Sequence, residues 1–162
     1  MNPVLVANLI ILLSIANGTP VVAKRLFGHR WSQPIDSGLV FVDGRRLFGP
    51  SKTIRGALAS IAITGATAPV LGVDPLIGAL AGAAAIVGDL FSSFVKRRCG
   101  LAPSTQAVGL DQIPEALLPV LACTCFLPIS TVDVVVTVAA FSVGAILLSP
   151  VFHRMGLRDR PF

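Results

Sequence analysis

Five long apolar segments alternate with polar ones along this chain of 162 residues. A helix needs about 20 mostly apolar residues to cross the hydrocarbon core of a bilayer, which is close to the length of each segment. The β-branched run 134–138 would favour a strand in a soluble protein, but lipid offers no partner to an open strand edge, so we expect a helix. The pattern predicts an all-α integral membrane protein, a five-transmembrane-helix bundle that forms one domain over 1–162. The predicted spans are residues 2–23, 54–71, 75–95, 114–131 and 133–150.

Basic residues mark one side of this predicted bundle. All 13 Lys and Arg residues lie in the polar loops 24–53 and 96–113, at Arg55 just inside the second span, or in the C-terminal tail. The connections near Asp74 and Asp133 carry none. Cytoplasmic loops of membrane proteins are enriched in Lys and Arg. We therefore expect a multi-pass protein of the cell (inner) membrane, with its N-terminus outside and its C-terminus and both polar loops in the cytoplasm.

The composition supports a membrane protein and argues against nucleic-acid binding. The chain is 54% hydrophobic and 13% charged, with a mean hydropathy of +0.82, whereas a soluble domain carries about 25% charged residues. The net charge of +5 follows from the one-sided basic loops, so no nucleic-acid partner is expected. Three cysteines, Cys99, Cys123 and Cys125, show neither a disulfide framework nor metal-ligand spacing.

The end of the third span carries the most unusual polar residues. If the span is helical, Asp89, Ser93, Lys96 and Arg97 share one face, because their spacings are +4, +7 and +8. Asp89 then lies roughly 10 Å inside the basic boundary. A carboxylate at that depth usually faces a bundle interior or a wet cavity. The structural alternative is a lone polar residue satisfied by a neighbouring helix, but further carboxylates and cations on the same side favour a functional site.

The residue types in the polar loops are those of a magnesium–phosphate site. Asp89, Asp111 and Glu115 supply carboxylates, and Mg²⁺ is usually held by one or two of these together with substrate phosphates. Arg and Lys side chains can neutralise the remaining phosphate charge. For the arginines of the tail, membrane topology and anionic lipid headgroups are a sufficient explanation. The first loop is 30 residues long, and ordered loops of that length are usually functional.

Lys52 and Thr53 directly precede the second span. A helix N-terminus favours anions, so Lys-Thr at this position is compatible with phosphate binding. It is not a P-loop, because Ser51 stands where that motif requires glycine. Taken alone, this signal is weak.

Several separated motifs resemble those of the CDP-archaeol synthases, in the same order and with the same number of predicted helices. The matching residues are Asn17 with Pro20, Asp43–Gly49, Lys52–Gly56, Gly88–Leu90, Ser92–Arg98 and Leu110–Gln112. The Ser-x-x-Lys-Arg core that begins at Ser93 is also similar to the phosphatidate cytidylyltransferase signature. The resemblance covers nearly the whole chain.

This resemblance implies a CTP:lipid-phosphate cytidylyltransferase that forms a CDP-lipid, releases pyrophosphate and uses Mg²⁺. The lipid phosphate in the bilayer would be archaetidic-acid-like or phosphatidic acid. Asp89 and Asp111 would bind the metal and act with Lys96 in catalysis. The implied substrate contacts are Asp43, Arg45, Lys52, Thr53, Arg55, Ser93, Arg97 and Asn17.

One departure from the family pattern concerns the second carboxylate. The family reads Asp-Gln-x-Asp, whereas this chain reads Asp111-Gln112-Ile113-Pro114-Glu115. Proline is favourable in the first turn of a helix, so Pro114 is expected to start the fourth span, with Glu115 as the candidate replacement for the missing Asp and as a third metal ligand. Because of this departure, the shorter first loop and the basic tail, a bacterial-type homologue of unassigned substrate is also open.

Three alternatives belong to other classes. A small membrane transporter would also keep an intramembrane Asp89, but it would need a polar path to the outer side, where the third span offers only Gly, Ala, Leu and Ile. A CDP-alcohol phosphotransferase would share the start of its motif at Asp43–Arg45, but its further aspartates, four residues apart, are missing before Asp74. A structural scaffold would not need acidic and basic residues paired on one side.

Overall fold

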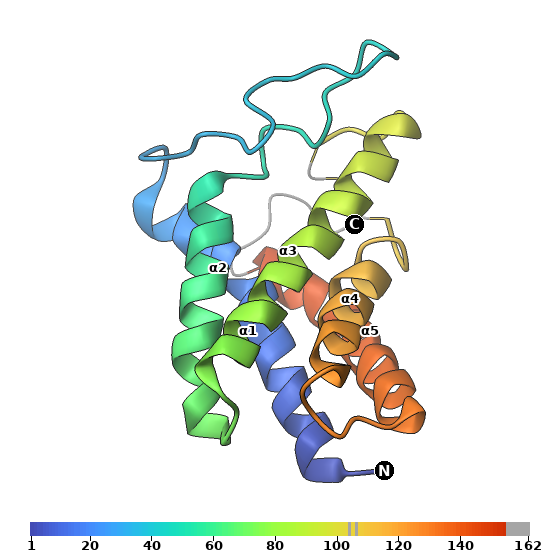
Figure 1. The fold of residues 1–162 in the computed structure, drawn as a ribbon. Coiled ribbons are helices and arrows are strands. Elements are labelled where there is room, and N and C mark those ends of the chain that lie inside the picture. The colour runs from blue at the N-terminus through green and yellow to red at the C-terminus, as the bar shows by residue number, and fades with distance from the viewer. Residues whose placement is uncertain (104, 106, 155–162) are drawn as a thin grey trace.

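The structure is a computed structural model that describes residues 1–103, 105 and 107–154, with side chains up to residue 149. Its helices are α1 (Pro3–Phe27), α2 (Ile54–Thr67), the 3₁₀ turn η1 (Ala68–Leu71), α3 (Pro75–Arg98), α4 (Gln112–Thr124) and α5 (Thr131–Arg154). In this part of the chain there is no β-strand, only two isolated bridges. The predicted all-α class is confirmed, and Figure 1 shows the bundle with the first polar loop above one end.

Four of the helical segments are long and apolar enough to cross a membrane. They are Pro3–Phe27, Ile54–Leu71, Pro75–Arg98 and Thr131–Ser149. Their outward faces expose large apolar side chains such as Leu58, Val87 and Leu147, which suits contact with lipid. The chain is therefore a multi-pass membrane protein.

The fourth helix differs from its predicted span. α4 has 13 residues, about 20 Å at helical rise, and ends at Thr124, whereas the sequence predicts helix up to residue 131. The physical reason is Pro128, which lacks an N–H and restricts the residue before it, so the chain turns before α5 begins. The count of five spans stays a prediction.

Small residues let α3 pack closely against both of its neighbours. A Cβ added to Gly78 would lie 2.4 Å from the Ala68 Cβ, and one added to Gly82 would lie 3.0 Å from the Ile61 Cα. Gly78 and Gly82, four residues apart, therefore serve close packing of α3 against α2 and η1. On the α4 side, a Cβ on Gly88 would lie 2.3 Å from the Pro114 carbonyl oxygen. The backbones of α3 and α4 thus nearly touch beside Asp89.

The apolar core joins four of the helices. It contains Leu9 and Leu13 of α1, Ala81 of α3, Ala116, Val120 and Cys123 of α4, and Phe141 of α5. This core lies on one side of Gly88, toward the N-terminal half of α3. The polar residues of α3 lie on the other side, under the first polar loop (Figure 1).

Candidate active site

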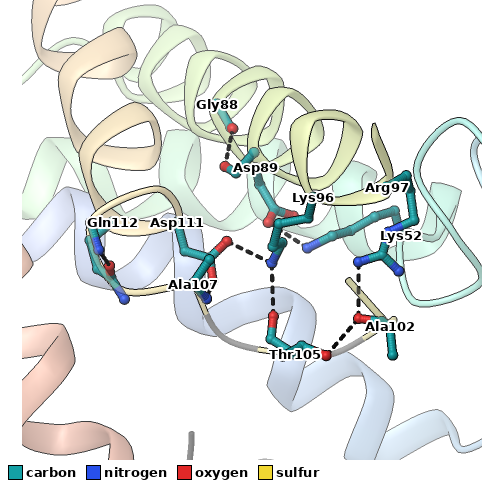
Figure 2. A network of polar contacts seen from close by, with 12 residues as sticks. Lys52, Gly88, Asp89, Lys96, Arg97, Ala102, Thr105, Ala107, Asp111 and Gln112 are labelled. Carbon is teal, nitrogen blue, oxygen red and sulfur yellow. Dashed lines mark hydrogen bonds and ion pairs between the residues drawn. The ribbon is translucent and has the colours of Figure 1, made fainter. Parts of the chain in front are cut away.

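Two ion pairs between residues far apart in the sequence form the centre of the site. Lys52, just before α2, donates a hydrogen bond to Asp89 of α3. The Lys96 Nζ of α3 lies 2.6 Å from an Asp111 oxygen at the start of α4. Figure 2 shows these four side chains converging between the helices and the second polar loop. The structure therefore brings together the three residues predicted to be catalytic, Asp89, Asp111 and Lys96, with Lys52.

Glu115 completes the cluster from α4. Its carboxyl group lies close enough to Asp89 and to Lys52 to act on both electrostatically. Burial lowers the pKa of Lys52, but the charges of Asp89, Glu115 and Asp111 outweigh burial, and the net pKa is raised. Lys52 therefore carries its positive charge at neutral pH, beside the carboxyl groups of Asp89, Glu115 and Asp111.

The backbone around Lys52 is held by the first polar loop. The Lys52 carbonyl accepts a hydrogen bond of 2.8 Å from the Ile35 N–H, and the Ile54 N–H donates to the Gln33 carbonyl at 3.0 Å. Thr53 is the N-cap of α2, because its Oγ1 accepts a hydrogen bond from the Gly56 N–H at 3.2 Å. Thr53 thus orients the segment that carries Lys52.

The second polar loop is pinned to α3 through Lys96 and Asp111. Lys96 is only 7% exposed, and its Nζ also donates to the Thr105 carbonyl at 3.1 Å. The other Asp111 oxygen accepts the Ala107 N–H at 2.9 Å. These contacts place a buried cation, at the C-terminal end of α3, beside a carboxylate at the start of α4.

Two buried residues near this cluster carry hydrogen-bond donors that lack partners. Arg97 is 6% exposed, and its Nη2 donates to the Ala102 carbonyl at 3.0 Å, while its Nε and Nη1 have no hydrogen-bond acceptor. The Ser93 hydroxyl is also buried without a partner. Buried guanidinium N–H groups are costly to leave unpaired and match phosphate oxygens well. Arg97 and Ser93 therefore have the geometry of an anion site.

The donor set also suits a divalent cation. The carboxyl groups of Asp89 and Glu115 lie beside the same Lys52, and the buried Asp111 Oδ1 has no hydrogen-bond donor beyond its ion pair with Lys96. Within residues 1–103, 105 and 107–154, no three His, Cys, Asp or Glu side chains form a complete metal-binding group. Mg²⁺ needs only one or two carboxylates when substrate phosphates supply the rest. The residues present thus fit Mg²⁺ bound together with a nucleotide.

Four predicted substrate residues lie away from the ion pairs. Arg55 donates to the carbonyls of Gly28 and Arg30, and so braces the start of the first loop. Asn17 donates to the carbonyl of Leu13, one turn earlier in α1, at 3.0 Å. Asp43 and Arg45 lie over the end of α3 and contact α3 there. Their roles toward a substrate stay predictions.

Asp36 and Arg46 organise the first loop, but neither was among the predicted site residues. Asp36 is 2% exposed and accepts hydrogen bonds from Arg46, at 2.5 Å, and from the Phe48 and Gly49 N–H groups. Burial alone would raise the pKa of Asp36, but the hydrogen bonds from Arg46 and from these N–H groups lower it by more. The net pKa is about 2, below the ordinary value of 3.8. The available signal was the turn sequence Asp-Ser-Gly, since Asp readily accepts the N–H two residues on.

Fold and site together define a class: a helical membrane protein in which acidic and basic residues, suited to phosphates and a divalent cation, meet beneath a long polar loop. Comparison with known proteins adds the family. The family model of CarS-like CDP-archaeol synthases matches residues 4–73. The CDP-archaeol synthase of Thermofilum pendens is 35% identical over 91% of this chain and 76% of its own length, and that of Pyrobaculum aerophilum 37% over 86% and 82%.

A solved structure agrees with the sequence comparison. It is described as an intramembrane enzyme for archaeal membrane lipid biosynthesis, and it matches with a TM-score of 0.70 and 28% identity over 85% of this chain and 90% of its own. The chain belongs to the CDP-archaeol synthase family. The predicted resemblance and enzyme class, a membrane-bound lipid cytidylyltransferase, are confirmed, and the transporter, phosphotransferase and scaffold alternatives are dropped.

Proposed function

We propose that this protein uses CTP and Mg²⁺ to convert a lipid phosphate of its own membrane into a CDP-lipid, with release of pyrophosphate. The observation that carries the proposal is the pair of ion pairs Lys52–Asp89 and Lys96–Asp111, with the unpaired donors of Arg97 beside them. The names of the relatives support an archaetidic-acid-like ether lipid over phosphatidic acid.

The proposed chemistry demands positioning and charge neutralisation. An oxygen of the lipid phosphate bonds to the α-phosphorus of CTP as the bond from that phosphorus to pyrophosphate breaks. Mg²⁺ bound by Asp89, Asp111 and Glu115 would neutralise part of the triphosphate charge. Arg97 and Ser93 donate hydrogen bonds to phosphate oxygens. Lys52 and Lys96, which pair with Asp89 and Asp111 in the structure, turn to phosphate oxygens when the nucleotide binds.

The proposed orientation puts this chemistry on the cytoplasmic face. Five spans with the N-terminus outside place every basic loop, and the end of α3, in the cytoplasm. CTP is then available from solution, while the lipid tails stay in the bilayer beside the helices. The cell membrane is the expected location.

The test is cytidylyl transfer from labelled CTP by the purified protein in detergent with Mg²⁺, with archaetidic acid and phosphatidic acid offered side by side. We expect a CDP-lipid product, with archaetidic acid preferred. Asp89→Asn should lower turnover by about 100-fold or more, because it removes a carboxylate needed for charge stabilisation.

Asp74→Asn is the matched control. Asp74 caps the opposite end of α3, where its side chain accepts a hydrogen bond from the Leu76 N–H at 2.7 Å, and Asn can accept the same bond. Its turnover should stay within about twofold of the parent. Full activity of a correctly folded Asp89→Asn protein, or the absence of any CDP-lipid from the parent, would refute the proposal.

A further inference from the structure

We infer that Arg98 is a positioning residue that clasps the hairpin 39–47 of the first polar loop onto the end of α3, and so sets the affinity for the nucleotide. Arg98 does not touch the ion pairs of the site. For its kinetic consequence the inference rests on the proposed function, whereas the clasp itself does not.

The hairpin is a small ordered unit. The Phe41 N–H donates to the Arg45 carbonyl at 2.8 Å, the Leu47 N–H to the Leu39 carbonyl at 3.1 Å, and Val40 bridges Arg46. At its tip, Gly44 has a φ of 75°, a conformation that favours glycine. A two-stranded hairpin alone is marginally stable in water, so its position must come from what it contacts.

Arg98 makes most of those contacts. Its Nη2 donates to the carbonyls of Arg46 at 2.7 Å and Arg45 at 3.2 Å, and its Nη1 lies 3.1 Å from Asp43. Its guanidinium carbon lies 4.8 Å from the ring centre of Phe41, in the hairpin, and 4.9 Å from that of Phe94, in α3. One side chain therefore joins the hairpin to α3 by charge, hydrogen bonds and cation–π contacts.

Arg45 returns the contact from the hairpin side. Its Nη1 donates to the carbonyls of Arg97 at 3.1 Å and Arg98 at 2.9 Å. These carbonyls belong to the last turn of α3. Carbonyls in the last turn of a helix have no N–H partner within that helix, and the C-terminal end of the helix dipole favours cations. Asp43 and Arg45, which the family resemblance assigns to the nucleotide, are thus used here to hold the hairpin.

The clasp reaches the candidate site through Asp36 and Gly49. Asp36 accepts hydrogen bonds from Arg46 of the hairpin and from the Gly49 N–H, so one carboxylate ties the hairpin to Gly49. Gly49 packs over Arg97: an added Cβ would lie 3.7 Å from the Arg97 Nη1. Lys52 follows within one turn. Releasing the hairpin would therefore loosen the segment that places Lys52 and covers Arg97.

The experiment compares Arg98→Ala with the parent by hydrogen exchange and by kinetics, both on the full protein in detergent. We expect faster exchange over residues 39–49 with unchanged exchange in the core of α3, a KM for CTP raised about tenfold, and a kcat within about threefold of the parent. Arg98→Lys should restore only part of the KM, because Lys keeps the charge but not the planar donor set.

Three further variants separate the clasp from general damage. Asp43→Asn keeps the acceptor for the Arg45 N–H but loses the ion pair, so it should raise KM in the parent and add little in the Arg98→Ala background. Phe94→Leu should raise KM modestly. Phe91→Leu, on the exposed face of the same helix, should have no effect.

Unchanged exchange and KM in Arg98→Ala would overturn the inference. So would a lower kcat at constant KM, because Arg98 would then act on the reacting groups. If Arg98→Ala does not fold, Asp43→Asn and Phe94→Leu give the same test. If the parent makes no CDP-lipid, the exchange measurement still decides on the clasp, so the two proposals fail separately.

Discussion

Carboxylates at the two ends of the bundle are satisfied in different ways. At the α3–α4 crossing, Asp89 and Asp111 pair with lysines from distant parts of the chain. At the opposite end, Asp133 accepts the Asn2 and Ser130 N–H groups and the Ser130 hydroxyl, and Asp74 accepts the Leu76 N–H.

The difference separates structural from chemical carboxylates. Asp133 is 2% exposed, and its carboxylate oxygens accept hydrogen bonds from Asn2 and Ser130. These donors cannot move away unless the end of a helix opens. A lysine ammonium can move to another anion while the backbone stays in place, so the paired carboxylates can be released to a metal or a phosphate. Burial alone does not identify the site; the kind of partner does.

The largest expected effect comes from breaking the Lys96–Asp111 pair. Lys96→Met leaves a mostly buried carboxylate without its cation, so we expect a loss of about 3 kcal/mol in the free energy of unfolding and no measurable turnover. Adding Asp111→Asn should restore much of the stability and none of the turnover.

Asp133→Asn at the other end is the control for this pair. It should lower the free energy of unfolding far less than Lys96→Met does, because Asn keeps an acceptor for the N–H groups, and it should leave turnover per folded molecule unchanged. Denaturant unfolding in detergent and CDP-lipid formation measure both quantities. If turnover in Lys96→Met stayed close to that of the parent, the carboxylates at the α3–α4 crossing would not be the chemical ones.

A second effect of intermediate size separates packing from catalysis. Gly88→Ala and Gly78→Ala both force a methyl group against backbone or side-chain atoms, and each should cost about 1–3 kcal/mol. Only Gly88→Ala moves α4 relative to Asp89, so only it should lower turnover per folded molecule, by about tenfold or more.

Gly144→Ala is the neutral control for both glycines, because nothing lies within 4 Å of its added Cβ. The same assays apply to all three variants. Equal turnover in Gly88→Ala and Gly78→Ala would show that the α3–α4 crossing does not position the site.

The smallest effect is a pH dependence from Asp36. Its folded pKa, about 2, is below the ordinary value of 3.8, so its contribution is fully present above pH 4 and is lost as pH falls toward 2. The parent should lose about 2 kcal/mol of stability across this window through Asp36. Asp36→Asn should lack this component, as measured by denaturant unfolding between pH 2 and pH 6. An identical pH profile in both proteins would contradict the lowered pKa.

The hydropathy pattern alone predicted where most of the helices lie along the chain. The helices Pro3–Phe27, Pro75–Arg98 and Thr131–Arg154 fall where the apolar runs predict spans, because lipid forces an apolar run to satisfy its own backbone as helix. The end of α4 was missed, since Pro128 and the turn before it interrupt an otherwise apolar run.

The sequence by itself also determined the chemistry at the end of α3, since helical spacing alone puts Asp89, Ser93, Lys96 and Arg97 on one face. Which residues meet was decided by the tertiary structure. Lys52 and Asp89 are 37 positions apart, and Arg55 meets the carbonyls of Gly28 and Arg30, which are 27 and 25 positions away. Asn17 binds a local carbonyl, that of Leu13. Local spacing fixes the direction of a side chain within one helix, but partners on different segments depend on how the helices cross, here at Gly88 against Pro114.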